Sequence, residues 1–495
     1  MTDALSVFAG YAGSAVDEAV DGGGRLLPGY GEVGPVLDGL GPERLAAAAA
    51  EVDRQRVARG VVFGSFTDGT FEETTFPMCP VPRVVPAADW AHLSAGVEQR
   101  TRALNAFLAD VYRPAGRRRS DVEKQPEVVR AGVLPEWVVA DSPGWRPGAV
   151  SFAAAGQQRV TVAGLDLLRG PGGRWVVLED NLRVPSGIGY AMANRQSSRA
   201  ALPQLFAEGR GAALTDPAGA AVVLHEALTE AAPAGCAGSP QVALLTDGAM
   251  NTAWFEHRLL AEAMGVPIAT PDVLWPTPDG GVAVEVDGER VPVDVFYRRF
   301  DDDDLAAHVT PSGMLLDTLL REAVRAGRLA VANVPGNGVA DDKATYCYVP
   351  EMIRFYLGEE PVLATVPTWV LADDDDLAAV VDRLHELVVK PVDGYGGQGV
   401  VFGSTCSAAQ LAQLRADVLR APHRFVAQEP VDFSTAPTCV DGELVPRHVD
   451  LRVFAVAGAT TRVLPAPLTR VALARGSMVV NSSRGGGSKD TWLIG

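Results

Sequence analysis

The segment between residues 387 and 402 constrains the fold of this chain more than any other. An apolar run typical of a β-strand ends at Lys390, and a loop with four glycines in six residues follows: Gly394, Gly396, Gly397 and Gly399. Glycines let successive backbone N–H groups converge on an anion, and a lysine ammonium adds a positive charge. The spacing does not match GxxxxGK[ST], the usual phosphate-binding loop. The segment therefore predicts an anion-binding loop of another kind, and a simple glycine turn between two strands is the alternative.

A second segment, residues 159–190, has the pattern of a β-hairpin that carries polar side chains. Apolar runs lie on both sides of a Gly-Pro-Gly-Gly turn at 170–173. Glu179 and Asn181 are two residues apart, so on a strand they point to the same face, and Asp166 on the other arm can face them. Two carboxylates and an amide oxygen suit Mg²⁺ bound with the phosphates of a nucleotide. The alternative is a solvated polar face, which is the more common meaning of an isolated Glu-x-Asn.

The last part of the chain, residues 449–495, has a β pattern and brings arginines together. Asp450 and Arg452 alternate onto one face of a predicted strand, and Arg470 lies on a neighbouring one. Arginines that converge in an acidic protein predict a site for an anionic ligand. The alternative is a structural ladder of aspartates and arginines. A general-base role for His448 stays open beside the more common structural role of a lone histidine.

The order of strand, loop, helix and strand between residues 220 and 335 predicts a parallel, doubly wound layer. Helices are expected at 45–59 and directly behind Pro86. The heptapeptide DDDDLAA occurs at 301–307 and again at 373–379. Both copies are interpreted as helix starts, because carboxylates are favourable at the positive end of the helix dipole. Metal binding is the alternative for these acidic runs.

Composition narrows the class of protein. The net charge of −18 disfavours binding to a nucleic-acid backbone, which needs a basic face. No run of about eighteen apolar residues is present, and the first residues lack the basic and apolar regions of a secretory signal. The five cysteines are dispersed without a CxxC pair, which favours free thiols in a reducing compartment. We therefore expect a cytoplasmic protein with no nucleic-acid or membrane partner, and composition leaves the oligomeric state open.

Lysine is rare in this chain. The 43 basic residues include only four lysines: Lys124, Lys343, Lys390 and Lys489. Where arginine serves as the general positive charge, a remaining lysine is a candidate for a role that needs a compact ammonium on a flexible stem.

Together these pieces resemble the ATP-grasp ligases, among them D-alanine–D-alanine ligase and the enzymes that add glutamate to a ribosomal protein. Asp166 lies thirteen residues before Glu179, and Asn181 completes a Glu-x-Asn, as in the D-alanine ligase pattern. Lys390 and its glycine loop resemble the second phosphate lysine and the closing loop of those enzymes, and Lys343 resembles the first lysine. The resemblance implies ATP and two Mg²⁺ ions as cofactors.

The resemblance also implies a role for each candidate residue. One set would hold the phosphates, adenine and ribose of ATP: Lys343, Lys390, Gly394, Gly396, Gly397, Gly399, Gln428 and Glu429. Metal ligands would be Asp166, Glu179 and Asn181. Catalytic residues would be Lys390, Arg452 and Arg470. Contacts with the substrate are expected from Arg183, Arg298, Arg299, Asn481 and Lys489. Structural ion pairs are the alternative for the first three of these, and anchoring of the chain end is the alternative for Lys489.

The order of the motifs departs from that of the usual ATP-grasp ligases, because the Asp…Glu-x-Asn segment precedes both lysines. Cutting the usual chain ahead of that hairpin gives this order, and neighbouring chain ends make such a permutation tolerable. From about residue 55 to 495 the chain resembles the circularly permuted ATP-grasp type 2 family, through residues 178–187, 297–302 and 481–492.

That resemblance implies an α/β (α+β) fold in permuted order. Five parts are expected: an N-terminal helical extension at 1–60, a part of the ATP-grasp C-lobe with the metal hairpin at 61–210, a Rossmann-like pre-ATP-grasp substrate domain at 211–335, the nucleotide-binding lobe at 336–430, and the remainder of the C-lobe at 431–495.

The activity implied is that of an ATP-dependent carboxylate–amine ligase. ATP would phosphorylate a carboxylate, an amine would displace phosphate, and ADP and phosphate would be released. The partners would be small-molecule or peptide carboxylates and amines. An ATP-grasp kinase that phosphorylates a hydroxyl and a non-catalytic ATP-binding scaffold are the alternatives.

Overall fold

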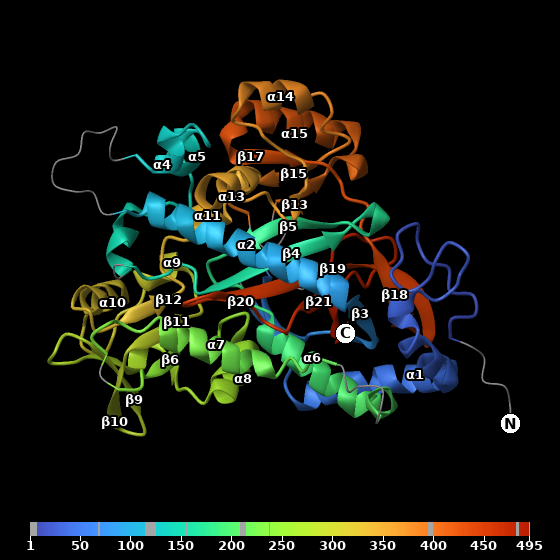
Figure 1. Cartoon of the computed structure of the whole chain (residues 1–495), viewed down its shortest axis with the longest axis horizontal. Helices are drawn as coiled ribbons and strands as arrows, with labels where there is room; N and C mark the ends of the chain where they lie inside the picture. Colours follow the sequence, from blue (N-terminus) through green and yellow to red (C-terminus); the bar gives the residue numbers. More distant parts are fainter. Residues whose placement is uncertain are drawn as a thin grey trace.

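The computed structural model describes residues 7–67, 70–113, 125–153, 156–207, 214–236, 238–394, 399–481 and 485–494. Within these residues the largest element is a sheet of nine strands across the middle of the molecule (Figure 1). Its path runs β13-β5-β4-β19-β21-β22-β3, and β18 and β20 pair with β19. The strands are β3 (Met78–Pro86), β4 (Val162–Arg169), β5 (Trp175–Asn181), β13 (Ala364–Thr365), β18 (Thr435–Val440), β19 (Glu443–Ala457), β20 (Thr461–Val463), β21 (Leu468–Val471) and β22 (Gly487–Ile494). Early and late segments of the chain share this sheet, because β3 pairs in parallel with β22.

Helices cover both faces of the large sheet. On one face lie α2 (Ala87–Val111) and α13 (Val349–Leu357), and on the other lie α1 (Val33–Ala58) and α6 (Ile188–Ala201). The side chains of β19 alternate accordingly: Val453 packs in the core under α2, and Phe454 packs in the core with α6. The predicted helices at 45–59 and behind Pro86 are confirmed. The first begins earlier than predicted, at Val33, and is kinked at Gly41, which has a φ of 71°.

A smaller sheet has the order β12-β11-β6-β7, and all of its pairs are parallel. Its strands are β6 (Val242–Leu245), β7 (Ile268–Ala269), β11 (Val295–Arg298) and β12 (Ala330–Ala332). Around it lie α7 (Gly219–Glu230), α8 (Trp254–Met264) and α10 (Leu316–Arg325), with an antiparallel sheet of β8 (Leu274–Pro276), β9 (Val282–Val286) and β10 (Glu289–Val293) at its side (Figure 1). The predicted parallel layer between residues 220 and 335 is confirmed.

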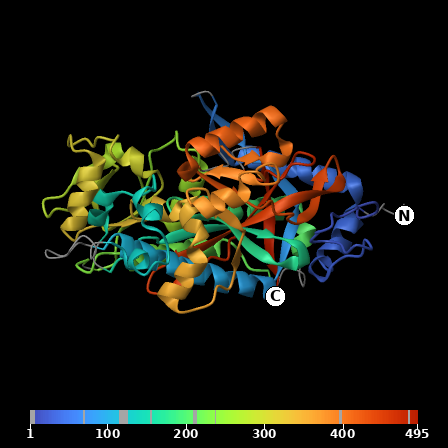
Figure 2. The same ribbon diagram turned by 90° about the horizontal axis from the view of Figure 1, so that it is seen from above.

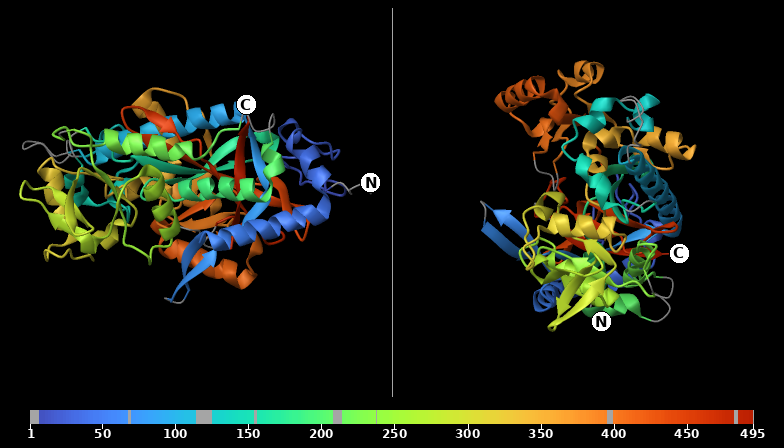
Figure 3. Two further views of the ribbon diagram at one scale, coloured as in Figure 1. Left: turned by 90° about the horizontal axis from the view of Figure 1, so that it is seen from below. Right: turned by 90° about the vertical axis from the view of Figure 1, so that its left-hand side faces the viewer.

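A separate small lobe is built on an antiparallel sheet with the order β14-β17-β15-β16. It consists of β14 (Thr368–Val370), β15 (Val388–Pro391), β16 (Val401–Phe402), β17 (Phe425–Gln428), α14 (Asp374–Val380) and α15 (Ala408–Arg420). The lobe has its own apolar core, which includes Leu371, Val380, Leu387, Leu414 and Val418. It stands above the large sheet in Figure 1, overlies the middle of the molecule in Figure 2, and is set apart from the rest in the right-hand view of Figure 3.

Both acidic heptapeptides begin helices, as predicted. Asp301 is the N-cap of α9 (Asp302–Leu305), and Asp373 is the N-cap of α14, where its side chain accepts hydrogen bonds from the backbone N–H groups of Asp375 and Asp376. Among the described residues no group of three or more His, Cys, Asp or Glu side chains is arranged to hold a metal ion.

The remaining elements are short. They are the hairpin of β1 (Val62–Thr67) and β2 (Thr70–Thr75), and the helices α4 (Glu127–Arg130), α5 (Glu136–Ala140), α11 (Gly338–Asp341) and α12 (Lys343–Cys347). No helix in the described part of the chain combines the length and the apolar character that crossing a membrane requires.

Candidate active site

A cavity lies between the small lobe and the large sheet. Its empty volume is about 1020 Å³, part of which is open to solvent. Among the described residues, those of its wall that were predicted from the sequence are Asp166, Glu179, Lys343, Lys390, Gly394, Gln428, Glu429, Arg470 and Asn481. They come from β4, β5, α12, β15, β17 and β21, from the residues directly after β15 and β17, and from the segment between β21 and β22. The fold thus brings residues from distant parts of the chain to one place.

The β4–β5 hairpin directs its polar side chains by means of a β-bulge. Asp166 pairs with Glu179, whereas the next pair along the hairpin skips Leu178. Val177 packs in the core beneath α2, and on a regular strand Glu179 would point the same way. The extra residue reverses this direction, so Glu179 joins Asp166 on the wall of the cavity.

Asp166 is held by two arginines. Its side chain is 2% exposed, and it accepts hydrogen bonds from Arg452 Nε and Nη2 at 2.6 and 2.8 Å and from Arg470 Nη2 at 2.7 Å. Burial raises the pKa of Asp166, but the two guanidinium groups outweigh burial and lower the pKa to about 2. Arg470 Nε also lies 3.0 Å from Asp450 Oδ1. These buried charges form a ladder across β4, β19 and β21, which was the alternative expected from the sequence, and Arg470 also lines the cavity.

The two predicted lysines approach the cavity from its other side. Lys343, the first residue of α12, places Nζ 3.2 Å from Glu179 Oε1 and also donates to the carbonyl of Gly394. Lys390 at the end of β15 donates to Gln428 Oε1 at 2.5 Å. Burial lowers the pKa of Lys390 to about 8, with the charge of Lys343 acting in the same direction and the carboxylates of Glu179 and Asp166 opposing it. An anion in this part of the cavity would favour the charged form of Lys390.

Apolar side chains form the rest of the wall near Gln428 and Glu429. They are Leu168, Leu178, Val388, Val400, Phe402, Pro430, Val431, Phe433, Met478, Val479 and Val480. An apolar slot with a few polar groups at its rim suits a planar heterocycle. The side chain of Gln428 contacts Lys390 and Thr368, and that of Glu429 contacts Arg383 at 3.3 Å.

Glu179 and Asn181 offer the oxygen ligands that Mg²⁺ prefers. The buried Nδ2 of Asn181 has no hydrogen-bond partner among the described residues. No bond of this nitrogen therefore opposes a rotation of the amide that presents its oxygen to an ion. Asp166 could join them only by sharing its carboxylate with Arg452 and Arg470. The residue types fit a magnesium site: Glu179, which pairs with Lys343, lies on the cavity wall, and Asn181 lies two residues further along β5, outside that wall.

The structure corrects the expectation that Lys489 contacts the substrate. Lys489 is fully buried in β22 and is not part of the cavity wall. Its Nζ lies 3.1 Å from Cys79 Sγ, 3.1 Å from the carbonyl of Val81 and 2.9 Å from that of Pro437. The side chain anchors the last strand against β3 and β18, which was the alternative role.

Arg298 and Arg299 are buried and make structural hydrogen bonds, which agrees with the alternative role expected for them. Arg298 is fully buried and donates to the carbonyls of Asn333 and Phe300. Arg299 is 3% exposed and donates to the carbonyl of Pro185 at 2.8 Å and to Glu256 at 3.2 Å. Neither lines the cavity. Both hold the end of β11 to neighbouring segments.

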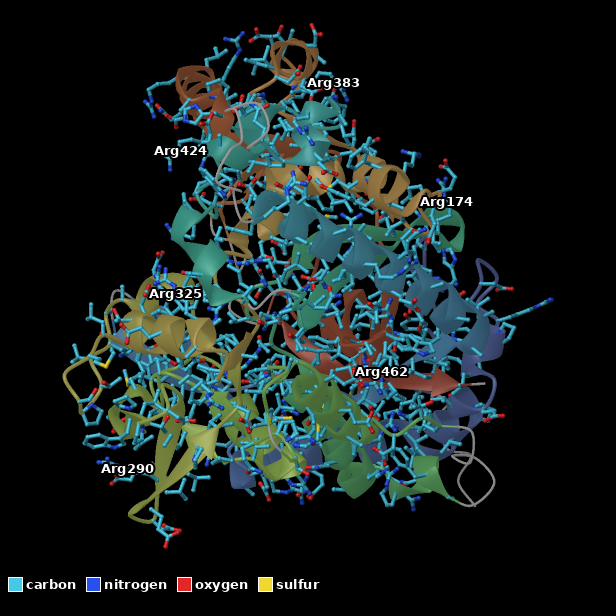
Figure 4. All side chains as sticks on the ribbon, turned by 60° about the vertical axis from the view of Figure 1, so that its left-hand side comes forward. Arg174, Arg290, Arg325, Arg383, Arg424 and Arg462 are labelled. Carbon is cyan, nitrogen blue, oxygen red and sulfur yellow. The ribbon has the colours of Figure 1, made fainter. Side chains whose placement is uncertain are left out.

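The remaining predicted site residues are Arg183 and three glycines of the loop. Arg183 is half-buried outside the wall and pairs with Asp341 at 2.8 Å and Asp301 at 3.2 Å. Gly399 has a φ of 72°, a left-handed conformation that favours glycine at the end of the loop. Gly396 and Gly397 lie outside the described residues. Figure 4 labels six further arginines, none of which lines the cavity: Arg174, Arg290, Arg325, Arg383, Arg424 and Arg462.

His448 has a structural position. Its Nδ1 lies 2.7 Å from the carbonyl of Phe433, and the two rings are 4.6 Å apart between centroids. Phe433 lines the cavity, so His448 supports the apolar wall. Sequence reasoning did not identify this wall, although the apolar run Met478–Val480 between glycine-rich stretches is a signal that could have pointed to it.

The fold and the cavity define an ATP-grasp protein: a small antiparallel lobe that carries Lys390 faces, across the cavity, a large sheet that carries a Glu-x-Asn hairpin. The chain belongs to the circularly permuted ATP-grasp type 2 family, whose family model matches residues 82–472. The family and the mixed α/β fold predicted from the sequence are confirmed.

Several relatives are similar over nearly the whole chain. A protein of Frankia casuarinae with the provisional name glutamate–cysteine ligase 2-2 is 47% identical over 98% of this chain and 54% of its own length. The chain thus spans about half the length of the first relatives it matches. An uncharacterized protein of Mycobacterium tuberculosis strain H37Rv is 40% identical over 99% of this chain and 86% of its own length. One of Synechocystis is 38% identical, with 97% of each chain covered.

A solved structure supports the fold alone. The glutathione synthetase-like effector GSS30 from Globodera pallida, in its apo form, superposes with a TM-score of 0.55 over 92% of this chain and 98% of its own, at 12% sequence identity.

Proposed function

We propose that this chain is an ATP-dependent ligase that joins a carboxylate to an amine through an acyl phosphate, with release of ADP and phosphate. The observation that carries the proposal is the meeting of Lys343, Lys390, Glu179 and Arg470 in one cavity with an apolar slot beside them. The family and the name of the Frankia relative support a ligase. That name describes a protein about twice as long, so it does not assign its activity to the half that this chain matches.

The chemistry needs two displacements. A carboxylate oxygen attacks the γ-phosphorus of ATP, the bond to the β-phosphate oxygen breaks, and ADP leaves. The amine nitrogen then attacks the acyl carbon, the bond to the phosphate oxygen breaks, and phosphate leaves while the nitrogen gives its proton to solvent. Positioning and neutralisation of charge supply most of the catalysis in such phosphoryl transfers.

The residues of the cavity provide these two effects. Lys343 and Lys390 would hold the phosphate oxygens below the glycine loop. Mg²⁺ held by Glu179 and Asn181 would neutralise charge on the phosphates. Arg470, kept in place by Asp450 and Asp166, would face the charge that develops on the acyl-phosphate oxygens. The apolar wall would keep water away from the acyl phosphate.

The chemical test is release of ADP from Mg-ATP with pooled amino acids, short peptides and polyamines as carboxylates and amines. A ligase requires both an acid and an amine, and its turnover should fall by about 10²-fold or more in Glu179→Gln. The matched control is Glu386→Gln, because Glu386 is a half-exposed glutamate of the small lobe outside the cavity. Release of ADP that needs no amine and leaves a stable phosphorylated product would instead establish a kinase.

A further inference from the structure

The two strands of the metal hairpin separate where the smaller sheet meets them. The ladder between β4 and β5 ends at the pair Gly164 and Asn181. Beyond this pair, the side chain of Asn333 lies between the two segments. Asn333 directly follows β12 of the smaller parallel sheet and is 1% exposed.

The amide of Asn333 is bonded on both sides. Its Oδ1 accepts the backbone N–H groups of Thr161 and Val162 at 2.9 and 2.7 Å. Its Nδ2 donates to the carbonyl of Val162 at 2.6 Å and to those of Leu182 and Arg183 at 3.0 and 3.1 Å. One buried side chain therefore takes the place of the missing rung of the ladder, and it satisfies backbone groups on both strands.

These contacts lie next to the proposed metal ligands. Leu182 follows Asn181 directly, and Val162 is on the same strand as Asp166. Residues next to the smaller parallel sheet also hold the segment after Leu182. Arg299, which follows β11, donates to the carbonyl of Pro185, and Glu256 of α8 accepts the N–H of Gly187 at 2.7 Å. Parallel sheets commonly bind ligands at their carboxyl edge. In this chain the segment 182–187 is bonded to residues at that edge.

We propose that Asn333 is a positioning residue for the metal site: by bonding Leu182 and Arg183 to the start of β4, its side chain fixes the end of β5, the strand that carries both Glu179 and Asn181, and so couples the smaller parallel sheet to metal binding. The inference rests on the proposed function, because it takes Glu179 and Asn181 as the ligands. Groups that orient metal ligands typically change metal affinity by about 10- to 100-fold when they are removed.

A matched control exists in Asn105. It is also buried, at 6% exposure, and its amide makes two backbone hydrogen bonds to Val160, at 3.0 and 2.9 Å, just before β4. These bonds hold the approach to β4 only. Loss of Asn105 should therefore lower stability without changing the spacing of the hairpin.

The experiment measures Mn²⁺ binding to the complex of the full chain with ADP, by electron paramagnetic resonance, together with ADP binding in EDTA and thermal unfolding. For Asn333→Ala we expect Mn²⁺ affinity to fall by about tenfold or more, with ADP affinity in EDTA within about twofold of wild type. Asn105→Ala should keep wild-type Mn²⁺ affinity despite a lower melting temperature. Wild-type Mn²⁺ affinity in Asn333→Ala, or an equal loss in Asn105→Ala, would overturn the inference.

Two further variants distinguish failure of the positioning role from failure of the proposed metal site. If Asn333→Ala does not fold, Asn333→Asp retains the acceptor for Thr161 and Val162 and removes the donations to the carbonyls of Val162, Leu182 and Arg183, and the same loss of Mn²⁺ affinity is expected. Glu179→Gln tests the proposed site itself. If wild type and Glu179→Gln bind Mn²⁺ alike, the metal site of the proposed function is wrong. If Glu179→Gln loses Mn²⁺ and both Asn333 variants keep it, only the positioning role is wrong.

Discussion

The two sides of the cavity compensate their charges in different ways. On the large sheet, Asp166 is bonded to Arg452 and Arg470, and Arg470 is bonded to Asp450. On the small lobe, Lys390 donates to the neutral amide of Gln428, and burial lowers its pKa to about 8. Opposite charges on the sheet stabilise each other in the protein alone. The lysine of the lobe is placed so that an incoming anion would stabilise it.

This difference means that the two sides should respond differently to substitution. A charge removed from the sheet leaves a buried partner uncompensated, which costs stability. A charge removed from the lobe relieves a desolvated ammonium, which costs binding and turnover but not stability. Lys343 connects the two sides, because it pairs with Glu179 on the sheet and donates to Gly394 at the loop.

The largest effect is expected for Asp166→Ala. Arg452 would lose its bidentate carboxylate and Arg470 one of its two carboxylate partners, so we expect a loss of about 3–5 kcal/mol in the free energy of unfolding and no measurable turnover. Urea unfolding measures the first effect and ADP release the second. A variant as stable as Glu386→Gln would show that the ladder does not hold the sheet.

Lys390→Met should lower turnover by about 10²-fold or more while stability stays equal or rises. The methionine keeps the apolar stem and removes an ammonium whose pKa burial has already lowered. ADP release and urea unfolding are compared with wild type and with Asp166→Ala. A loss of stability as large as that of Asp166→Ala would remove the contrast between the two sides of the cavity.

A smaller, graded effect is expected from pH. Binding of phosphate requires the ammonium form of Lys390, and the pKa of this group in the nucleotide-free protein is about 8. Affinity for ADP in EDTA should therefore stay level at lower pH and fall as the pH rises through about 8, by up to about tenfold per pH unit. Calorimetric titration across this range measures the slope. Lys390→Met should lack the inflection, and an inflection that persists there belongs to another group.

The parts of the fold and of the site that could be predicted from the sequence are those set by residues close together in the chain. The β4–β5 hairpin, the strand that ends at Lys390 and the parallel layer follow local patterns: a Gly-Pro-Gly-Gly turn, glycine spacing, and alternation of strands with helices. The family resemblance then supplied roles for residues that those patterns had brought together.

Features that depend on contacts between distant segments could not be predicted. Nothing local to Leu178 indicates the bulge that turns Glu179 toward the cavity, and nothing local to Asn333 indicates that it bonds to two other segments. Lys489 was misjudged for the same reason. Its rarity suggested chemistry, but its partners are the carbonyls of Val81 and Pro437, far away in the sequence.

The smallest effect on turnover is expected for Lys489→Met. This lysine shares the large sheet with Asp166 but lies outside the cavity, so loss of its hydrogen bonds to two buried carbonyls should lower stability by about 1–3 kcal/mol. ADP affinity and ADP release, measured below the melting temperature, should remain within about twofold of wild type, because the ammonium bonds to Cys79, Val81 and Pro437, none of which lines the cavity. Rates and melting temperature are measured on the same preparation. A fall in turnover as large as that expected for Lys390→Met would show that Lys489 belongs to the site. A lysine outside the cavity wall would then be as important for turnover as one on it.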